Sequence, residues 1–408
     1  MKLLHTADWH LGKRLDHFSR LEEQKQVMAE ICEIADREAV DAVLIAGDLY
    51  DQINPSTDAV ELLYQSLHRL AANGKRAVIG IAGNHDSPNR IEAPDPLARA
   101  CGILLMGYPH TKLPVFELES GLKVLRSDEG FLEVKVPNQL APLRLIATPY
   151  ANEIRLKTFL GTEDKEAALR EVLQQHWQQL ANTYCDDQGV NLLMTHLFLM
   201  QKGGERPEEP EDEKPILTVG GAQEVYTDAI PSQVQYAALG HLHRYQVVSE
   251  SPCPVVYSSS PLAYSMSEAG QRKQVVLIEV EPGQPARFQP IELKQGRPLL
   301  RKTFDDLQNA IQWLTEHQDA LVELTMVSET YLSAAERKLL SEAHDHIITL
   351  IPQVKHPDLP QSYTNDLDLS KSVEALFVDY FQHRHDGQQP NDALMALFRE
   401  VLAEEEES

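Results

Sequence analysis

The sequence predicts an α/β fold in which helices cover a central sheet. Residues 1–106 alternate short apolar runs with stretches of helical periodicity, the order expected of a βαβαβ unit. Five short polar motifs each follow a predicted strand, and ligands bind at that edge of open α/β sheets. A chain of 408 residues is longer than one average domain, so we expect one large domain followed by smaller parts.

The elements of the first part follow in order. Residues 3–4 are predicted as a short strand, and a capping box at 19–22 begins a helix whose apolar residues recur at helical spacing. Residues 42–46 form a buried strand, residues 54–55 cap the next helix, and residues 77–81 form a third strand.

The rest of the chain predicts further strands and a second, smaller α+β unit. Residues 107–150 suggest irregular strands and turns, and residues 298–354 alternate strand, helix, strand, helix, strand. The large domain also contains a predicted helix at 164–182 and strands at 191–194, 236–239, 255–257 and 275–278. The predicted division is a large domain over 1–285, an α+β domain over 286–360 and a helical segment over 365–408.

The last segment carries two apolar stripes at helical spacing, separated by the polar residues 383–390. We expect two short amphipathic helices, which either pack back on the small domain or bind the helices of another protein. The first stripe is Val373, Leu376, Phe377, Tyr380 and Phe381, and the second is Leu394, Leu397, Phe398, Val401 and Leu402.

Charge and cysteine content bear on the class of protein. The formal net charge is −25, which by itself argues against nucleic-acid binding, because phosphate contacts usually rest on a basic surface. Bound divalent metals or a basic partner would reverse this locally. The stretch 205–214, with six acidic residues and two prolines, is expected to be a solvated loop.

Four widely spaced cysteines without a C-x-x-C pair argue against a disulfide framework or a thiolate zinc site, and fit a reducing compartment. The first residues include polar side chains where a signal peptide would stay apolar, and no apolar run approaches the ~20 residues of a membrane helix. We therefore expect a cytoplasmic protein that does not enter a membrane.

The five motifs carry the candidate metal ligands. Their Asp, Asn and His side chains offer oxygen and nitrogen without thiolate, a set that suits Mn²⁺, Fe²⁺, Mg²⁺ or Zn²⁺. A carboxylate such as Asp48 can bridge two cations, and two metals ~3.5–4 Å apart can promote in-line attack of water at phosphorus. His85 is placed to protonate the leaving oxygen. The motifs are Asp8-Trp9-His10, Gly47-Asp48-Leu49-Tyr50-Asp51, Gly83-Asn84-His85-Asp86, Thr195-His196 and Gly240-His241-Leu242-His243.

Two aspartates of the motifs have a less definite role. Each either fixes a histidine or a loop amide, or is an Asx-turn residue. We favour the fixing role for Asp86 and leave Asp51 open. Histidines outside the motifs, which include His17, His110, His344 and His346, are expected to be structural or on the surface. There is no Walker A motif, so any ATP dependence must come from a partner.

Taken together, the motifs are similar to those of the calcineurin-like metallophosphoesterase superfamily. The longer strings HTADWHLGKRL, IAGDLYDQINPS, IAGNHDSPNR and ALGHLHRYQ resemble more narrowly the SbcD family, the nuclease subunits of bacterial SbcCD complexes. The resemblance is strong over the large domain and follows order and size beyond it. It implies a layered β-sandwich core flanked by helices, with a small α+β cap domain that helps to orient DNA and C-terminal helices.

The resemblance also implies a set of site residues. Mn²⁺ would be the usual activating metal, and His85 would be the general-acid or transition-state histidine. Asp48 would bridge the two metals. The first metal would be held by Asp8, His10, Asp48 and His243, and the second by Asp48, Asn84, His196 and His241.

By the same resemblance, the activities are 3′→5′ exonuclease on double-stranded DNA, endonuclease on single strands and hairpin opening, in DNA repair, recombination and replication. The tail helices would dock on the coiled-coil base of an SbcC-type ATPase. Two copies would pair through residues 55–72 and 90–100, giving a homodimer within a heterotetramer. One departure from the family pattern is Ser259, where glycine is commoner, and we expect only a local change there.

Two other functions stay open on the residues alone. A small-molecule phosphodiesterase or phosphoprotein phosphatase would use the same metal site, and the negative charge favours it. A metal-free scaffold would only bridge ATPase subunits, but it would not require His85 or a bridging Asp48. The DWHLG string, the cap-sized domain and the tail helices favour the nuclease.

Overall fold

The computed structural model describes residues 1–159, 165–207 and 224–354, with shorter pieces of the C-terminal part at 376–378, 381, 389–390, 394–395 and 398. The chain divides into two compact units, Met1–Gln353 and Val354–Ser408. Most of the acidic stretch predicted as a loop, from residue 208 onward, lies outside the described residues, as does most of the C-terminal segment.

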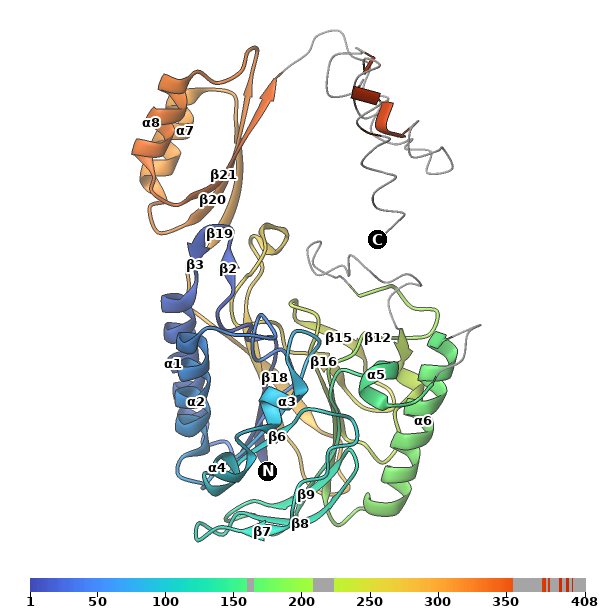
Figure 1. The fold of residues 1–408 in the computed structure, drawn as a ribbon. Helices are drawn as coiled ribbons and strands as arrows, with labels where there is room; N and C mark the ends of the chain where they lie inside the picture. Colours follow the sequence, from blue (N-terminus) through green and yellow to red (C-terminus); the bar gives the residue numbers. More distant parts are fainter. Residues whose placement is uncertain are drawn as a thin grey trace. The chain divides into compact units, whose positions relative to one another are not determined.

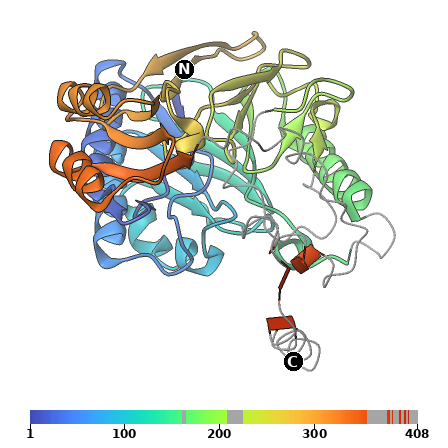
Figure 2. The same cartoon turned by 90° about the horizontal axis from the view of Figure 1, so that it is seen from above.

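Two packed sheets with helices on both outer faces make up most of the first unit (Figures 1 and 2). One apolar core lies between the sheets and is built from both of them. Helices α1 (Leu21–Arg37) and α2 (Thr57–Ala71) cover the first sheet, and α6 (Lys165–Tyr184) covers the second. This is the layered β-sandwich flanked by helices that the family resemblance implies, with two sheets where the residue pattern alone indicated one.

The first sheet confirms the predicted βαβαβ unit. Its order is β18-β17-β1-β4-β5-β6, in which β1, β4, β5 and β6 run parallel and β17 and β18 are antiparallel additions. The sheet runs on past residue 285, where the sequence placed the end of the large domain. The strands are β1 (Lys2–Thr6), β4 (Ala42–Ile45), β5 (Ala77–Ile81), β6 (Ile103–Met106), β17 (Gln274–Glu279) and β18 (Arg287–Glu292).

Both helix starts differ from the expected ones. The capping box at 19–22 is wrong, because Ser19 lies in the hairpin of β2 (Arg14–Leu15) and β3 (Phe18–Ser19) and the N-cap residue, Arg20, gives no side-chain cap. The cap at 54–55 is also wrong: Ser56 is the N-cap of α2, and its Oγ accepts a hydrogen bond from the Ala59 amide at 3.3 Å.

The second sheet has the order β15-β16-β14-β11-β10-β9-β8-β7. Its central strands β10, β11, β14 and β16 run parallel, so their carboxyl ends meet at one edge. The strands are β7 (Phe116–Glu117), β8 (Lys123–Asp128), β9 (Phe131–Lys135), β10 (Leu143–Thr148), β11 (Val190–Thr195), β14 (Tyr236–Leu239), β15 (Gln246–Ser249) and β16 (Val255–Tyr257). Short elements complete this unit: α3 (Pro88–Glu92), α4 (Asp95–Ala100), α5 (Glu153–Leu156), β12 (Leu199–Met200), β13 (Val225–Tyr226), η1 (Thr227–Ala229) and η2 (Met266–Glu268).

Residues 299–354 form the predicted strand, helix, strand, helix, strand. Helices α7 (Leu307–Glu316) and α8 (Ala334–Ala343) lie on one side of β19 (Leu299–Phe304), β20 (Leu321–Ser328) and β21 (Ile347–Val354) (Figure 1). A small apolar cluster joins this sheet to the β2–β3 hairpin and to η2, through Leu15, Leu299, Leu321 and Ile348 with Met266 packed against them. The three-domain division itself stays a prediction.

In the second unit, the described residues include one residue from each predicted stripe in direct contact. The rings of Phe377 and Phe398 stack with centroids 3.9 Å apart and planes 11° apart. The two apolar stripes therefore meet at this point. No helix in the described part of the chain is both long and apolar enough to cross a membrane.

Candidate metal centre

All five polar motifs meet at one edge, between the two sheets. The loops after β1, β4 and β5 bring residues from the first sheet, and the loops after β11 and β14 bring residues from the second. Backbone bonds tie the loops together: the amide of Asp8 donates to the Gly47 carbonyl at 3.0 Å, and the amide of His241 donates to Asp8 Oδ1 at 2.8 Å. The strand order thus brings together motifs that are more than 200 residues apart.

One group of candidate ligands surrounds His10. Ligand atoms of Asp8, His10 and His243 all lie within 4.8 Å of one another. The Nε2 atoms of His10 and His243 are 2.9 Å apart, so both rings aim the same atom at one point. Asp48 Oδ2 is 3.6 Å from His10 Nε2. These four residues are the predicted first set.

The second group surrounds Asn84. Its Oδ1 lies 2.9 Å from His196 Nε2 and 3.2 Å from His241 Nδ1. Asp48 Oδ2 is 3.2 Å from His196 Nε2, and so the same oxygen that faces the first group also faces the second. The structure therefore brings together all seven predicted ligands and puts Asp48 between the two groups.

The residues fit a pair of divalent cations. Asp8 and Asp48 are fully buried, and Asp8 Oδ2 accepts no hydrogen bond from any residue that the structure describes. A buried carboxylate is costly unless it is paired or coordinates a metal. Two buried carboxylates, one amide oxygen and four imidazoles make up the oxygen and nitrogen set that borderline and hard divalent ions accept.

Backbone strain is concentrated at these positions. Four ligand candidates have a positive φ, which is uncommon outside glycine and costs about 1 kcal/mol or more at each residue. The angles are 55° at Asp8, 42° at His10, 50° at Asp48 and 100° at His241. Such strain persists where the surrounding structure holds it in place. The four strained residues lie on the three loops that follow β1, β4 and β14.

Two glycines allow the loops to approach closely. A Cβ on Gly83 would lie 2.0 Å from Asp48 Oδ1, and a Cβ on Gly47, whose φ is +95°, would lie 2.2 Å from His196 Nδ1. A side chain at either position would displace a candidate ligand. Glycine is therefore required on steric grounds in the G-D-x-x-D and G-N-H-D motifs.

The buried carboxylates and histidines of the cluster shift one another's pKa. Burial raises the pKa of Asp8 to about 6, against the attraction of His196 and His243. Burial would raise the pKa of Asp48 as well, but the neighbouring histidines, His196 foremost, hold it well below its usual range. Burial would lower the pKa of His196, yet Asp48 and Asp8 raise it to about 9. Asp48 and His196 therefore stabilise each other's charged form.

His85 lies beside the first group and is half-buried. Its ring is 4.8 Å from that of His10, edge to face, and its Nδ1 is 2.9 Å from the carbonyl oxygen of Asp51. Because a carbonyl can only accept, Nδ1 carries a proton, and Nε2 is the nitrogen that gains or loses one. Asp51, whose role the sequence left open, orients His85 through its backbone carbonyl. Its side-chain Oδ1 lies 3.7 Å from His10 Nδ1.

Asp86 has the fixing role that the sequence favoured. Its carboxylate accepts hydrogen bonds from the amides of Leu49 at 3.0 Å, Tyr50 at 2.9 Å and Gly83 at 2.9 Å. It thereby ties the loop that carries Asp48 to the loop that carries Asn84 and His85.

Arg155 contacts the site and was not among the residues predicted for it. It lies on α5, after an N-cap at Asn152, and its guanidinium donates to the carbonyls of Gly83 at 2.7 Å, Asn84 at 3.3 Å and Asp86 at 2.9 Å. This guanidinium therefore clamps the backbone on either side of His85. No sequence signal separates it from other polar helix residues.

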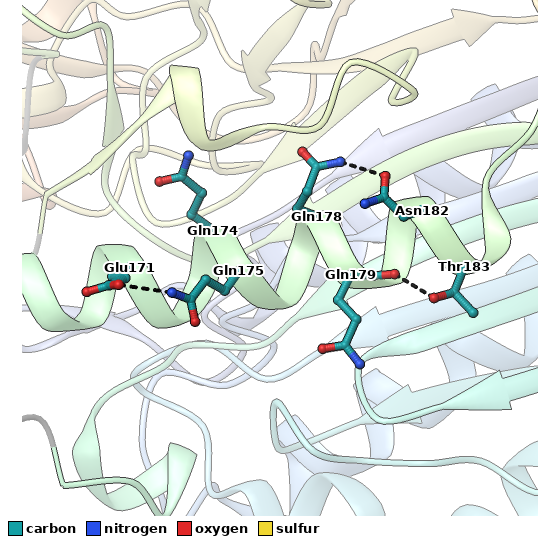
Figure 3. Close-up of a pocket in the computed structure, with 7 residues that line it drawn as sticks. All are labelled: Glu171, Gln174, Gln175, Gln178, Gln179, Asn182 and Thr183. Atoms are coloured by element: carbon teal, nitrogen blue, oxygen red, sulfur yellow. Dashed lines mark hydrogen bonds between the residues drawn. The ribbon is translucent and has the colours of Figure 1, made fainter.

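Surface hollows also lie outside the cluster. The one in Figure 3 lies on the outer face of α6, and its Gln, Asn, Thr and Glu side chains bond mainly along the helix, as Gln178 does with Asn182 at 2.9 Å. It contains none of the candidate ligands. A second hollow, of about 540 Å³, is polar and includes Arg244 and Arg272, the first of which follows His243 directly in sequence.

Comparison with known proteins agrees with this geometry. The family model for calcineurin-like phosphoesterases matches residues 1–245, and the chain belongs to that family. The chain is 34% identical to the SbcD protein of the nuclease SbcCD from Bacillus subtilis over 414 aligned residues, which covers 100% of this chain and 99% of the relative. It is 34% identical to the SbcD protein of Rhodobacter capsulatus, over 74% of this chain and 71% of the relative, and 29% identical to that of Staphylococcus epidermidis, over 73% and 71%. Within the calcineurin-like phosphoesterases, the chain therefore groups with the SbcD nucleases.

Proposed function

We propose that this chain is a dinuclear-metal nuclease that hydrolyses phosphodiester bonds in DNA as the SbcD component of an SbcCD-type complex. The observation that carries the proposal is the convergence of seven candidate ligands at one edge of the two sheets, in a chain related over its full length to such nucleases. They are Asp8, His10, Asp48, Asn84, His196, His241 and His243.

The proposed ligand sets are those the resemblance implies. Asp8, His10 and His243 would hold one metal, Asn84, His196 and His241 would hold the other, and Asp48 would contribute to both. We propose Mn²⁺ as the metal; the oxygen and nitrogen set also suits Mg²⁺, Fe²⁺ and Zn²⁺. When bound, the two metals supply Lewis acidity to the phosphate and lower the pKa of the attacking water.

The chain's own residues contribute orientation and a proton. His85, held through Nδ1 by the Asp51 carbonyl, presents Nε2 toward the reacting phosphate and protonates the leaving 3′ or 5′ oxygen. Asp86 and Arg155 keep the loops that carry Asp48 and His85 in register.

The proposed substrate is DNA, although the formal net charge of the chain is −25. The cations that count are those near the cluster: the metals themselves, and arginines 244 and 272 in the polar hollow beyond His243. We propose that these positions receive the DNA backbone, and that exonuclease, single-strand endonuclease and hairpin-opening activities all use the one metal centre. The small α+β domain would orient the DNA.

The partners follow from the relatives' name and the tail. The chain contains no ATP-binding motif, and we propose that an SbcC-type coiled-coil ATPase binds the two apolar stripes of the second unit. The 3.9 Å contact between Phe377 and Phe398 supports a helix pair that presents one joint apolar face. Pairing of two copies through residues 55–72 and 90–100 stays part of the proposal.

Deletion of residues 366–408 tests the partner, and a DNA digest tests the activity. The truncated chain should bind Mn²⁺ normally and no longer co-purify with the ATPase. If the truncated chain still co-purified with the ATPase, the tail would have a structural role instead. In the digest, the full chain with its ATPase should shorten end-labelled duplex DNA in Mn²⁺ and ATP and lose this activity in EDTA.

A small-molecule phosphodiesterase on the same metal centre is the second candidate. The acidic composition favours it, because a small substrate needs no basic surface. Brisk hydrolysis of bis-p-nitrophenyl phosphate without any cleavage of DNA would select it.

A further inference from the structure

A buried ion pair lies directly behind His243. Glu268 is 1% exposed and Lys273 is 8% exposed, and the Lys273 ammonium donates to Glu268 Oε2. Charged side chains of this kind are rarely so buried, because removal from water costs more than an ordinary ion pair returns. Neither residue belongs to one of the five motifs, so the pair needs its own explanation.

Glu268 also contacts the candidate ligand itself. Its Oε1 lies 3.3 Å from Nδ1 of His243 and accepts a hydrogen bond from the Tyr264 amide at 3.1 Å. The other ring nitrogen of His243, Nε2, faces Nε2 of His10 at 2.9 Å. One nitrogen of the imidazole therefore faces the carboxylate, and the opposite nitrogen faces the metal centre.

Lys273 holds the other end of the same histidine. Its Nζ donates to the backbone carbonyl of His243 at 2.8 Å and to Ser260 Oγ at 3.0 Å, and the Ser260 amide donates to the same carbonyl at 3.2 Å. The pair thus fixes the main chain of His243 through Lys273 and its ring through Glu268.

The geometry points to Glu268 as the positioning residue that sets His243 as an Nε2 metal ligand, with Lys273 as the group that holds Glu268 and His243 together. A carboxylate that accepts from Nδ1–H fixes the tautomer whose Nε2 has a lone pair for the metal, and it fixes the ring plane. The inference rests on the proposed metal centre, but it concerns metal binding and not cleavage.

The segment that carries the pair extends this function to the neighbouring ligand loop. Tyr264 donates its hydroxyl to the carbonyl of Trp9, and Gln24 Nε2 donates to Tyr264 Oη at 3.1 Å and to the carbonyl of His10 at 2.8 Å. Residues 260–273 therefore support both histidines of the first group from behind.

Two double variants separate positioning from simple packing. In Glu268→Met/Lys273→Met, both charges are gone, which avoids a lone buried charge and keeps stability near wild type. The carboxylate that faces His243 Nδ1 is also gone. In Glu268→Gln/Lys273→Met, the amide oxygen can turn toward Nδ1 because no ammonium competes for it. Both variants lose the ion pair equally.

The measurement is Mn²⁺ titration of the full-length chain by calorimetry, without DNA, with thermal melting of each metal-free variant alongside. We expect the Met/Met variant to bind one of its two Mn²⁺ ions about 10- to 100-fold more weakly, the usual effect of losing a residue behind a metal ligand. The Gln/Met variant should bind that ion within about threefold of wild type, and the second ion should bind normally in both.

The matched control is Glu133→Gln, which disrupts another buried ion pair, that of Glu133 with Arg144, far in sequence from the ligand motifs. It should lower the melting temperature and leave Mn²⁺ affinity unchanged. Equal Mn²⁺ affinity in the two double variants, or a similar loss in the control, would overturn the inference. A wild-type chain that binds two Mn²⁺ but cleaves no DNA would overturn the proposed function and leave this inference standing.

Discussion

Replacement of Asp86 tests how the loops of the metal centre are held. Its carboxylate accepts three backbone hydrogen bonds in a fully buried position, two at Oδ2 and one at Oδ1. Bonds to a charged acceptor contribute about 1.5–3 kcal/mol each. At the low end, Asp86→Ala should lower the free energy of unfolding by about 4.5 kcal/mol, because three buried amides lose their only carboxylate.

Asp86→Asn provides a graded comparison. Its single amide oxygen can keep the two bonds from Leu49 and Gly83, so only the bond from Tyr50 is lost, at about 1.5 kcal/mol. At about 2 °C per kcal/mol, the melting temperature should fall by about 9 °C for Ala and about 3 °C for Asn.

The assay is thermal unfolding at pH 8 in EDTA, followed by far-UV circular dichroism. Burial raises the pKa of Asp86 to about 6, so the carboxylate is ionised at pH 8. Asp306→Ala serves as the control, because it removes a single exposed N-cap bond to the Asn309 amide and should cost only about 1 kcal/mol. A melting temperature for Asp86→Ala within 2 °C of wild type would refute the reasoning, as would equal effects of Ala and Asn.

Three further predictions concern His85, Arg155 and His5. His85→Gln should bind Mn²⁺ and DNA as wild type does but cleave about 10²- to 10⁴-fold more slowly, since it removes the proposed proton donor; wild-type cleavage rates would remove His85 from the mechanism. Arg155→Met keeps the alkyl stem but loses three bonds to loop carbonyls, so calorimetry should show one Mn²⁺ bound about 10-fold more weakly, whereas unchanged affinity would make the clamp dispensable. Burial lowers the pKa of His5 to about 3. Below pH 6.5 the imidazole is therefore protonated in the unfolded chain but stays neutral in the folded chain. The free energy of unfolding should fall by about 1.4 kcal/mol per pH unit as the pH is lowered from 6.5 toward 3. Denaturant titrations at pH 7.5 and 5 should show this loss reduced by about 2 kcal/mol in His5→Gln, and an unchanged loss would contradict the assignment.

Much of the site could be predicted because its residues stand in short motifs after strands. Parallel strands align their carboxyl ends, so Asp8 and Asp48, each within three residues of the end of a strand of the first sheet, were expected to meet at one edge. That His196 and His241 come from the other sheet could not be derived from local pattern. It depends on how the two sheets pack, which only the fold determines.

The residues that support the ligand loops could not be predicted from the sequence, for a different reason. Arg155 and Glu268 act on carbonyls or rings that are close only after folding, and in sequence they look like ordinary charged surface residues. Both predicted helix caps were wrong for local reasons. Ser19 pairs in the β2–β3 hairpin and does not begin a helix. Ser56, and not residues 54–55, is close enough to the first helical amides to act as the N-cap. Ser259 was expected to cause only a local change, and its φ of 83° lies in the region that favours glycine, which explains why glycine is the commoner residue there.

The most direct test of the account is digestion of end-labelled duplex and hairpin DNA by the full chain with its ATPase partner, in Mn²⁺ and ATP, beside the His85→Gln variant. The account predicts cleavage by the wild type, its loss in EDTA, and its loss in the variant, which should still bind two Mn²⁺. Intact DNA with the wild type, in a preparation that binds two Mn²⁺ and hydrolyses a small phosphodiester rapidly, would contradict the nuclease and leave a phosphodiesterase of another substrate class.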